Sequence, residues 1–358
     1  MSCSAYDHHR SQLFKASFLW SACISMGGFL TFSTVLLSLN LTASHFKHYH
    51  QPRLQRPITR ILMMVPLYSV CSWLSLVWSE YSVYINVIRD CYEAFVVYNF
   101  FVLFMEYLGA DAAARKLVLS MKGPRRLPPP MCCLHHRPNY RHFLSFCSIG
   151  ILQYVVVRVS TTVASVAMEL NHVYCPESMD PRFGHFYTTV INAVSVGTAM
   201  FTLFSLYLPI RSDIAEFNPV LQFLSIKFII FFQFWMGIII KVTSSAEMAS
   251  NQGTPPWSQA DVSLLVQNFA TIIEMLLASI LHFWAFDVTI FTIRNAPTTS
   301  IWDGVKDSFY WLDLYHDFIF ALSFLHRRVL VCCISQFTYV PLSANSSAEN
   351  INSSEQIT

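Results

Sequence analysis

The chain has 358 residues, of which 54% are hydrophobic and only 12% are charged, and its formal net charge is +2. A soluble domain carries about 25% charged residues, so this composition excludes a single water-soluble domain and predicts that much apolar surface faces lipid. The nearly neutral charge argues against nucleic acid as a partner. The common nucleotide-binding, hydrolase and zinc-protease motifs are missing from the sequence, so we predict no enzyme activity and no cofactor.

Seven segments are apolar and long enough to cross a bilayer, which takes roughly 20 residues. In chain order they cover residues 17–39, 61–78, 83–108, 143–168, 183–210, 217–240 and 262–286. The first run is longer than the apolar part of a cleavable signal peptide, so we predict that it stays in the mature protein as a span. The predicted fold is an all-α membrane protein, with a bundle of seven transmembrane helices over residues 17–286.

The distribution of basic residues predicts the orientation of this bundle. Most of the 23 Lys and Arg residues lie in segments that are cytoplasmic if the N-terminus is outside. Positive loops stay on the cytoplasmic side, so the arrangement is predicted to be N-out and C-in. Residues 1–16 then form an extracellular or lumenal N-terminus.

The loop over residues 109–142 combines several prolines with an excess of Lys and Arg. We predict that it forms no compact domain and lies along the anionic inner leaflet. Its Cys132 and Cys133 lie among basic residues near the membrane, which suits S-acylation. A metal site is not predicted, because a second cysteine pair at ligand spacing is missing.

The chain after the last span divides into two predicted parts. Apolar residues at helical spacing between positions 301 and 325 predict an amphipathic helix at the cytoplasmic surface, within a segment that covers residues 287–340. Residues 341–358 are rich in Ser and Asn and are predicted to be disordered.

Charged side chains inside the spans are the main candidate site, because charge in the hydrocarbon layer is costly unless it is paired. With a rise of about 1.5 Å per residue, they fall at two depths. The predicted outer cluster contains Arg89, Asp90, Glu93 and Arg158, and the predicted inner pair is Lys227 with Glu274. These pairs either join helices or line a path for a solute. Polar neighbours within the spans favour the path, namely Asn99, Gln233, Gln267 and His282.

Several ordered blocks of sequence resemble the transmembrane protein 184 and organic solute transporter alpha family. The first block runs from His50 to Leu62, with the sequence HQPRLQRPITRIL, and the second, RDCYEA, begins at Arg89. Later blocks include Pro219 with Lys227, then Phe234-Trp235, then Glu274-Met275 with His282. The resemblance implies seven helices in the N-out, C-in orientation.

In the organic solute transporter branch, the resemblance implies facilitated diffusion of steroid and bile-acid conjugates, a single-span beta subunit and an acylated run of cysteines. This sequence has only Cys132-Cys133 in that loop, and it has Met236 where the family usually has Gln. It therefore looks closer to the transmembrane protein 184 branch, and neither bile-acid transport nor the beta subunit is assumed.

From these observations we predict a multi-pass protein of the plasma membrane or of an endosomal or vacuolar membrane, with lipids as its surroundings. Its predicted function is facilitated transport of amphipathic organic solutes that are sterol-like or anionic. A homo-oligomer or a single-span partner subunit stays open. The alternative is a membrane scaffold or receptor in trafficking or signalling that transports nothing.

Overall fold

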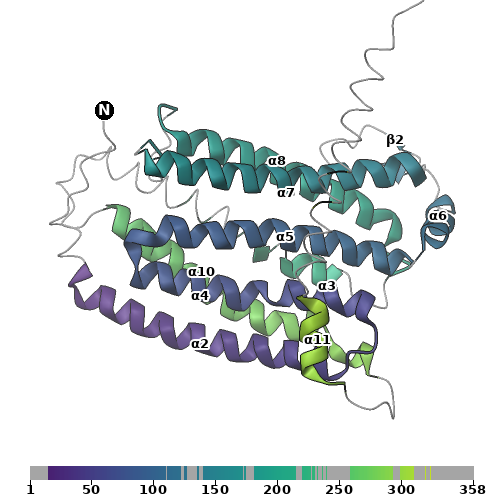
Figure 1. The fold of residues 1–358 in the computed structure, drawn as a ribbon, viewed down its shortest axis with the longest axis horizontal. Helices are drawn as coiled ribbons and strands as arrows, with labels where there is room; N and C mark the ends of the chain where they lie inside the picture. The colour runs from purple at the N-terminus through teal and green to yellow at the C-terminus, as the bar shows by residue number, and fades with distance from the viewer. Residues whose placement is uncertain are drawn as a thin grey trace, which may run out of the picture.

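The computed structural model describes residues 15–292 except for 110, 122–124, 127–134, 137–139, 172, 175–180, 215–219 and most of 227–258, and it also describes residues 299–309, 319 and 323. Long helices lie side by side along one direction (Figure 1). The predicted disordered tail over residues 341–358, and all but the last two residues of the predicted N-terminal segment, lie outside the described residues.

The first helix, α2, covers Phe18–Lys47, and the Ser17 side chain caps it by accepting a hydrogen bond from the Trp20 N–H. At 30 residues it is about 45 Å long, which exceeds the hydrocarbon layer. One face carries exposed apolar side chains such as Phe29 and Phe32. The opposite face packs on α4, where the Trp73 indole N–H donates to the carbonyl of Ile24 over 3.1 Å.

The second predicted span, residues 61–78, corresponds to α4 over Met64–Val77. The helical segment begins nine residues earlier than predicted, with α3 over Pro52–Leu62, and the two helices meet at Met63. Pro66 has no N–H to donate to the carbonyl of Leu62, four residues earlier, so the regular helix is interrupted at this point. Helix α3 begins with Pro52 in its first turn, where a missing N–H costs nothing.

A short 3₁₀ turn, η1 over Ser79–Tyr81, leads into α5 over Ser82–Leu108, which ends at Gly109 with a φ of 145°. The basic loop then contains α6 over Ala112–Ser120 and two short antiparallel strands, β1 over Arg125–Arg126 and β2 over His135–His136. The sequence analysis predicted none of these three elements. Helix α6 is held to the end of α5 by Arg115, whose guanidinium donates to the Gly109 carbonyl over 2.7 Å.

The remaining described elements are α7 over Tyr140–Leu170, α8 over Gly184–Ile210, α10 over Gln259–Ala285, η3 over Val288–Phe291 and α11 over Ile301–Ser308. Helix α8 packs on α7, and α7 packs on α5. Helix α5 also contacts α3 and α4, while α2, α4 and α10 pack on one another. Helix α5 therefore joins the α7–α8 pair to the group formed by α2, α4 and α10.

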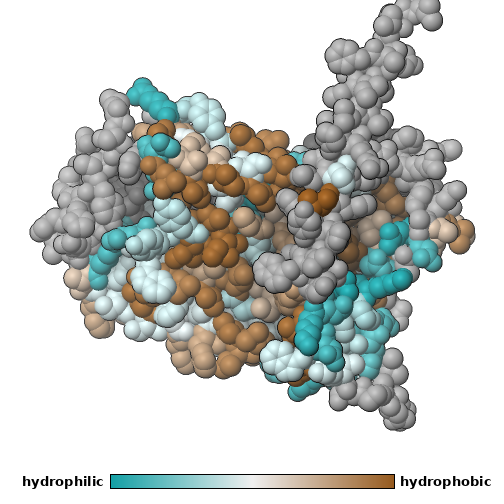
Figure 2. Space-filling model, in the orientation of Figure 1, coloured by the Kyte–Doolittle hydropathy of each residue, from teal (hydrophilic) through white to brown (hydrophobic). Residues whose placement is uncertain are grey.

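Six helical segments are long and apolar enough to cross a membrane among the described residues. They are Phe18–Lys47, Pro52–Val77, Ser79–Leu108, Phe146–Leu170, Gly184–Ile210 and Asp261–Phe291. Figure 2 shows apolar residues over the middle of the face in view, with hydrophilic residues gathered at the end that holds α3 and α11. The chain is therefore a multi-pass integral membrane protein.

Half of the predicted span over residues 217–240 lies outside the described residues, so the count of seven helices and the N-out orientation stay predictions. Its described start does have a defined place. The ring of Phe223 stacks on that of Tyr207 in α8, with centroids 6.0 Å apart, and on that of Phe100 in α5 over 6.1 Å. This part of the chain therefore packs where α5 and α8 approach each other.

The contact between α7 and α8 depends on a glycine. A Cβ atom at Gly150 would lie 2.3 Å from the methyl carbon of Thr202, a β-branched side chain that is itself buried. We expect Gly150→Ala to lower the free energy of unfolding by about 1–3 kcal/mol, because it overpacks the contact between two helices. Gly197→Ala is the matched control, since no atom lies within 4 Å of its Cβ position and the helix should gain about 0.5–1 kcal/mol. The melting temperatures of the two purified variants test this contrast, and equal values would contradict it.

Candidate functional site

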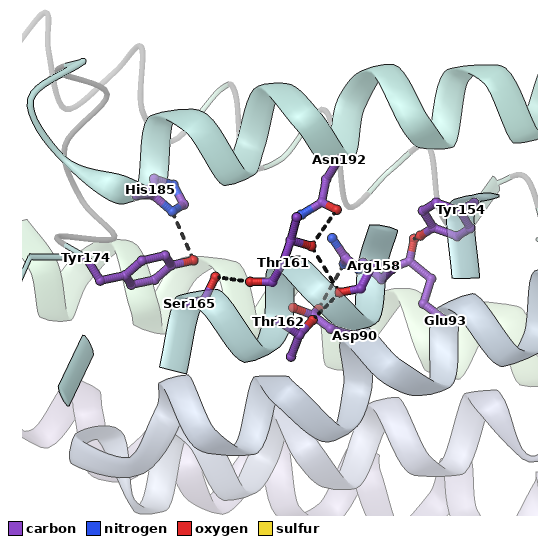
Figure 3. Close-up of polar contacts among 10 residues, drawn as sticks. All are labelled: Asp90, Glu93, Tyr154, Arg158, Thr161, Thr162, Ser165, Tyr174, His185 and Asn192. Carbon is purple, nitrogen blue, oxygen red and sulfur yellow. Dashed lines mark hydrogen bonds and ion pairs between the residues drawn. The ribbon is translucent and has the colours of Figure 1, made fainter. Parts of the chain in front are cut away.

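A charge cluster joins α5 to α7 inside the membrane-length helices (Figure 3). One terminal nitrogen of Arg158 donates to Asp90 Oδ1 over 2.9 Å and to Glu93 Oε2 over 2.9 Å. The second oxygen of Glu93 accepts a hydrogen bond of 2.7 Å from the Tyr154 hydroxyl. Asp90 and Glu93 are three residues apart and Tyr154 and Arg158 are four apart, so each pair shares one face of its helix. The structure thus brings together three of the four residues predicted for the outer cluster and adds Tyr154.

Hydroxyl and amide groups extend this cluster along α7 and α8. Thr161 and Thr162 both donate to the backbone carbonyl of Arg158, over 3.0 and 2.8 Å. Thr161 also donates to Asn192 Oδ1 of α8 over 2.9 Å, and Ser165 donates to the Thr161 carbonyl over 2.9 Å. Figure 3 shows these groups in a polar row that leads away from Arg158 along α7.

Arg89 does not join the ion pairs of the predicted outer cluster. Its guanidinium carbon lies 5.9 Å from the centroid of the Tyr68 ring in α4, which is a cation–π contact. Its terminal nitrogen NH1 is buried and has no hydrogen-bond partner within the described residues. Adjacent residues of a helix point about 100° apart, so Arg89 faces α4 while Asp90 faces α7.

The predicted inner pair is only half described. Glu274 and His282 of α10 are buried, with 2% of each residue exposed, whereas Lys227 and Gln233 lie outside the described residues. The pairing of Lys227 with Glu274 therefore stays a prediction. His282 packs edge-on against Phe286, with ring centroids 5.2 Å apart. Gln267 is partly buried, and its carbonyl accepts a hydrogen bond from the Thr271 hydroxyl over 2.8 Å.

Arg60 of α3 is a buried polar residue that the sequence analysis did not single out. Its Nε donates to the Ser308 carbonyl of α11 over 2.8 Å, and its NH1 donates to Asn99 Oδ1 of α5 over 3.4 Å. Its own carbonyl accepts a hydrogen bond of 2.6 Å from the Tyr92 hydroxyl. Asn99, a predicted path residue, thus lies in a bridge between α5 and α11, away from the Arg158 cluster. The signal that could have found Arg60 is its place in the first block of the family resemblance.

Helix α11 docks on the corner between α2 and α3. Asp307 forms an ion pair with Arg56 and accepts a hydrogen bond of 2.7 Å from the Tyr49 hydroxyl. Burial raises the pKa of Tyr49 to about 12, so this hydroxyl stays protonated and remains a donor at physiological pH. Thr59 donates to the Ser308 hydroxyl over 3.1 Å. The predicted amphipathic helix begins at Ile301 as expected, but α11 ends at Ser308, where Phe309 leaves the helical conformation, instead of running unbroken to residue 325. Of the residues from 310 to 325, the structure describes only 319 and 323.

The other predicted features of the site are not tested by this geometry. Cys132 and Cys133 lie outside the described residues, so their S-acylation stays a prediction. Among the described residues no group of three or more His, Cys, Asp or Glu side chains is placed to hold a metal ion.

The fold and this site define a class of protein, a multi-pass helical membrane protein with a charge network between two of its membrane-length helices. Residues 23–291 match the family described as organic solute transporter Ostalpha, which is more than half of the chain. The chain therefore belongs to the organic solute transporter Ostalpha family. No solved structure matches it.

Proposed function

We propose that this protein carries amphipathic organic solutes with an anionic group down their concentration gradient, and that the cluster around Arg158 is part of the path. The observation that supports this most directly is the sharing of one arginine nitrogen between two carboxylates, Asp90 and Glu93. The Nε of Arg158 is buried without a hydrogen-bond partner in the described part of the chain. This arginine therefore has a donor available beyond the two carboxylates that it already binds.

An anionic head group can exchange with one of these carboxylates. Removing a charge from its partner inside an apolar medium is costly unless another charge of the same sign takes its place. A solute anion that engages Arg158 supplies this replacement, and the Tyr154 hydroxyl keeps Glu93 hydrogen-bonded meanwhile. The exchange then avoids a state in which the buried guanidinium has no anion beside it.

The apolar part of the solute can stay in the hydrocarbon layer during this exchange. The polar row formed by Thr161, Thr162 and Asn192 lies beside exposed apolar residues of the same two helices, such as Val163 of α7 and Val194 of α8. The head group therefore moves along hydroxyls while the hydrocarbon body remains in contact with lipid. The sequence contains no nucleotide-binding motif, so the gradient of the solute drives the movement.

Uptake of a labelled sterol conjugate into liposomes that contain the purified protein is the direct test. We expect uptake above that of empty liposomes, with saturation and with equal final concentrations on both sides. A variant with Arg115→Gln serves as the control, because Arg115 pairs with Glu106 outside the cluster over 3.0 Å and should transport normally.

If a broad panel of anionic and neutral sterol-like solutes shows no uptake above that of empty liposomes, the carrier proposal is wrong. The alternative of a scaffold or receptor in trafficking or signalling then takes its place. Activity of the chain by itself would also show that a single-span partner subunit is not required. Fluorescence microscopy of the tagged protein would decide between the plasma membrane and an endosomal or vacuolar membrane.

A further inference from the structure

Three hydroxyl groups follow one face of α4. Tyr68, Ser72 and Ser75 are separated by four and three residues, the spacing that places side chains on one side of a helix. Their exposed fractions are 2%, 0% and 0%, and none of the three hydroxyls has a hydrogen-bond partner in the described structure. By contrast Ser69, on the same helix, donates to the Thr31 hydroxyl over 3.1 Å. Buried hydroxyls are normally hydrogen-bonded, so three such groups in one row indicate a site for a polar ligand.

Helix α5 adds two polar groups to this row. The turn η1 connects α4 to α5 so that the helices run antiparallel, and the contact between Arg89 and the Tyr68 ring fixes their register. Asn86 lies three residues before Arg89, and Ser72 lies four residues after Tyr68, so both occur about one turn closer to η1. Arg89 NH1 and Asn86 Oδ1 are buried without hydrogen-bond partners among the described residues. Because an Asn amide can be turned over, Asn86 can present its donor in place of its acceptor.

Arg89 is the charged residue of α5 that contacts the Tyr68 ring of α4, and the carboxylates of Glu93 and Asp90 also act on Tyr68 from a greater distance. Asp90 and Glu93 both accept hydrogen bonds from Arg158, which lies on the α7 side. Arg89 has no carboxylate within ion-pair distance in the part of the chain that the structure describes, and its guanidinium lies over the ring of Tyr68. A cation would be repelled by Arg89 at this position. Several donors around one arginine are the arrangement that stabilises an anion.

We infer that the hairpin of α4 and α5 binds a small monovalent anion such as chloride. The Arg89 guanidinium provides the charge, and the hydroxyls of Tyr68 and Ser72, the two nearest to the level of Arg89, donate hydrogen bonds. One arginine balances a single negative charge, so a divalent anion such as phosphate does not fit. Ordered water would satisfy the hydroxyls but would leave Arg89 without a direct ion pair among the described residues.

The row of hydroxyls also extends from the level of Arg89 towards η1 at the end of α4. Ser75 lies two residues before the end of α4, and Trp78 and Tyr81 beside it are 55% and 61% exposed. At about 1.5 Å per residue, Ser72 lies about 4.5 Å and Tyr68 about 10 Å deeper than Ser75. The row therefore places a hydroxyl at every turn of α4 between η1 and the level of Arg89. This site is separate from the solute path and does not depend on the carrier proposal.

The melting temperature of the purified full-length protein, measured while chloride replaces gluconate at constant ionic strength, tests this inference. We expect the melting temperature to rise with chloride and to saturate, because a ligand that binds the folded state stabilises it. Arg89→Gln should raise the half-saturating chloride concentration at least about tenfold, since it removes the positive charge that pairs with the anion and leaves only neutral donors. The double variant Ser72→Ala with Ser75→Ala should do the same, and it should fold, because neither hydroxyl has a partner among the described residues.

The matched control is Ser69→Ala, which removes a hydroxyl that is bonded within the protein. It should lower the melting temperature at every chloride concentration and leave the half-saturating concentration unchanged. The inference is wrong if chloride does not change the melting temperature of the unmodified protein, or if both variants keep its half-saturating concentration. It is also wrong if an amphipathic carboxylate, but not chloride, produces the Arg89-dependent rise, because the site would then bind the head group of a solute.

Discussion

Replacing Arg158 with methionine is expected to remove most of the folded protein from the membrane. Asp90 and Glu93 would both lose the cation that binds them, and two carboxylates would remain between apolar helices. Breaking a buried ion pair by removing one partner costs about 3–5 kcal/mol, a large part of the stability of an ordinary domain. The amount of monodisperse protein after extraction, measured by fluorescence-detected size-exclusion chromatography, should fall several-fold.

A triple variant distinguishes a structural role of the cluster from a role in transport. Arg158→Met with Asp90→Asn and Glu93→Gln removes every charge at once, so no uncompensated charge stays buried between the helices. We expect the triple variant to accumulate close to the level of the unmodified protein. Its uptake of an anionic solute should fall at least about tenfold, the effect of losing 1.4 kcal/mol of binding.

The result that decides between the two roles is the uptake by the triple variant. Unchanged uptake would show that the cluster only joins α5 to α7, and the proposed path would be wrong. Arg115→Met is the control for ion-pair loss in general. Arg115 of α6 pairs with Glu106 near the end of α5, and each side chain is 20% exposed, which is close to the exposure of Arg158, so this variant loses an ion pair of similar burial outside the cluster and should keep its uptake.

The length of the apolar runs was enough to predict six of the spans, but it did not predict where the helices end. Helix α2 continues eight residues beyond the predicted limit at 39, as far as Lys47. Thr42 and Ser44 donate to backbone carbonyls four residues earlier and remain helical outside the apolar run. An apolar run predicts which residues lie in the lipid layer, whereas the end of a helix depends on backbone hydrogen bonds that can continue beyond this layer. The break at Met63 was also missed, because Pro66 lies inside a run that is apolar throughout.

The sequence predicted the depth of the charged residues in the membrane, but not the direction in which their side chains point. The fixed rise of a helix makes depth calculable, and it placed Arg158 at the level of Asp90 and Glu93. The direction in which a side chain points depends on how each helix is rotated, which a single sequence does not specify. The prediction therefore included Arg89, which faces α4, and omitted Tyr154. The partner of Arg60 could not be predicted, because Ser308 reaches it only through the docking of α11.

Gly304→Val is expected to release α11 from the corner between α2 and α3. A Cβ atom at Gly304 would lie 2.6 Å from a ring carbon of Phe46, which is only 4% exposed and cannot move aside easily. Overpacking of this kind costs about 1–3 kcal/mol. The ion pair between Arg56 and Asp307 cannot offset this, since both side chains are about a third exposed and such pairs contribute at most about 1 kcal/mol.

Trypsin cleavage after Lys306 reports this release, because Lys306 lies within α11 and its peptide bond must leave the helix to be cut. The cleavage rate of the purified protein should rise about tenfold in Gly304→Val, the factor that corresponds to 1.4 kcal/mol. Trp302→Val introduces the same side chain at a position that is 73% exposed and should change the rate little. Adding Phe46→Ala to Gly304→Val should restore part of the protection, because it makes room for the new side chain. If the valine variant is cleaved as slowly as the unmodified protein, the docked position of α11 is wrong. Arg60 then does not connect Asn99 of α5 to Ser308 of α11.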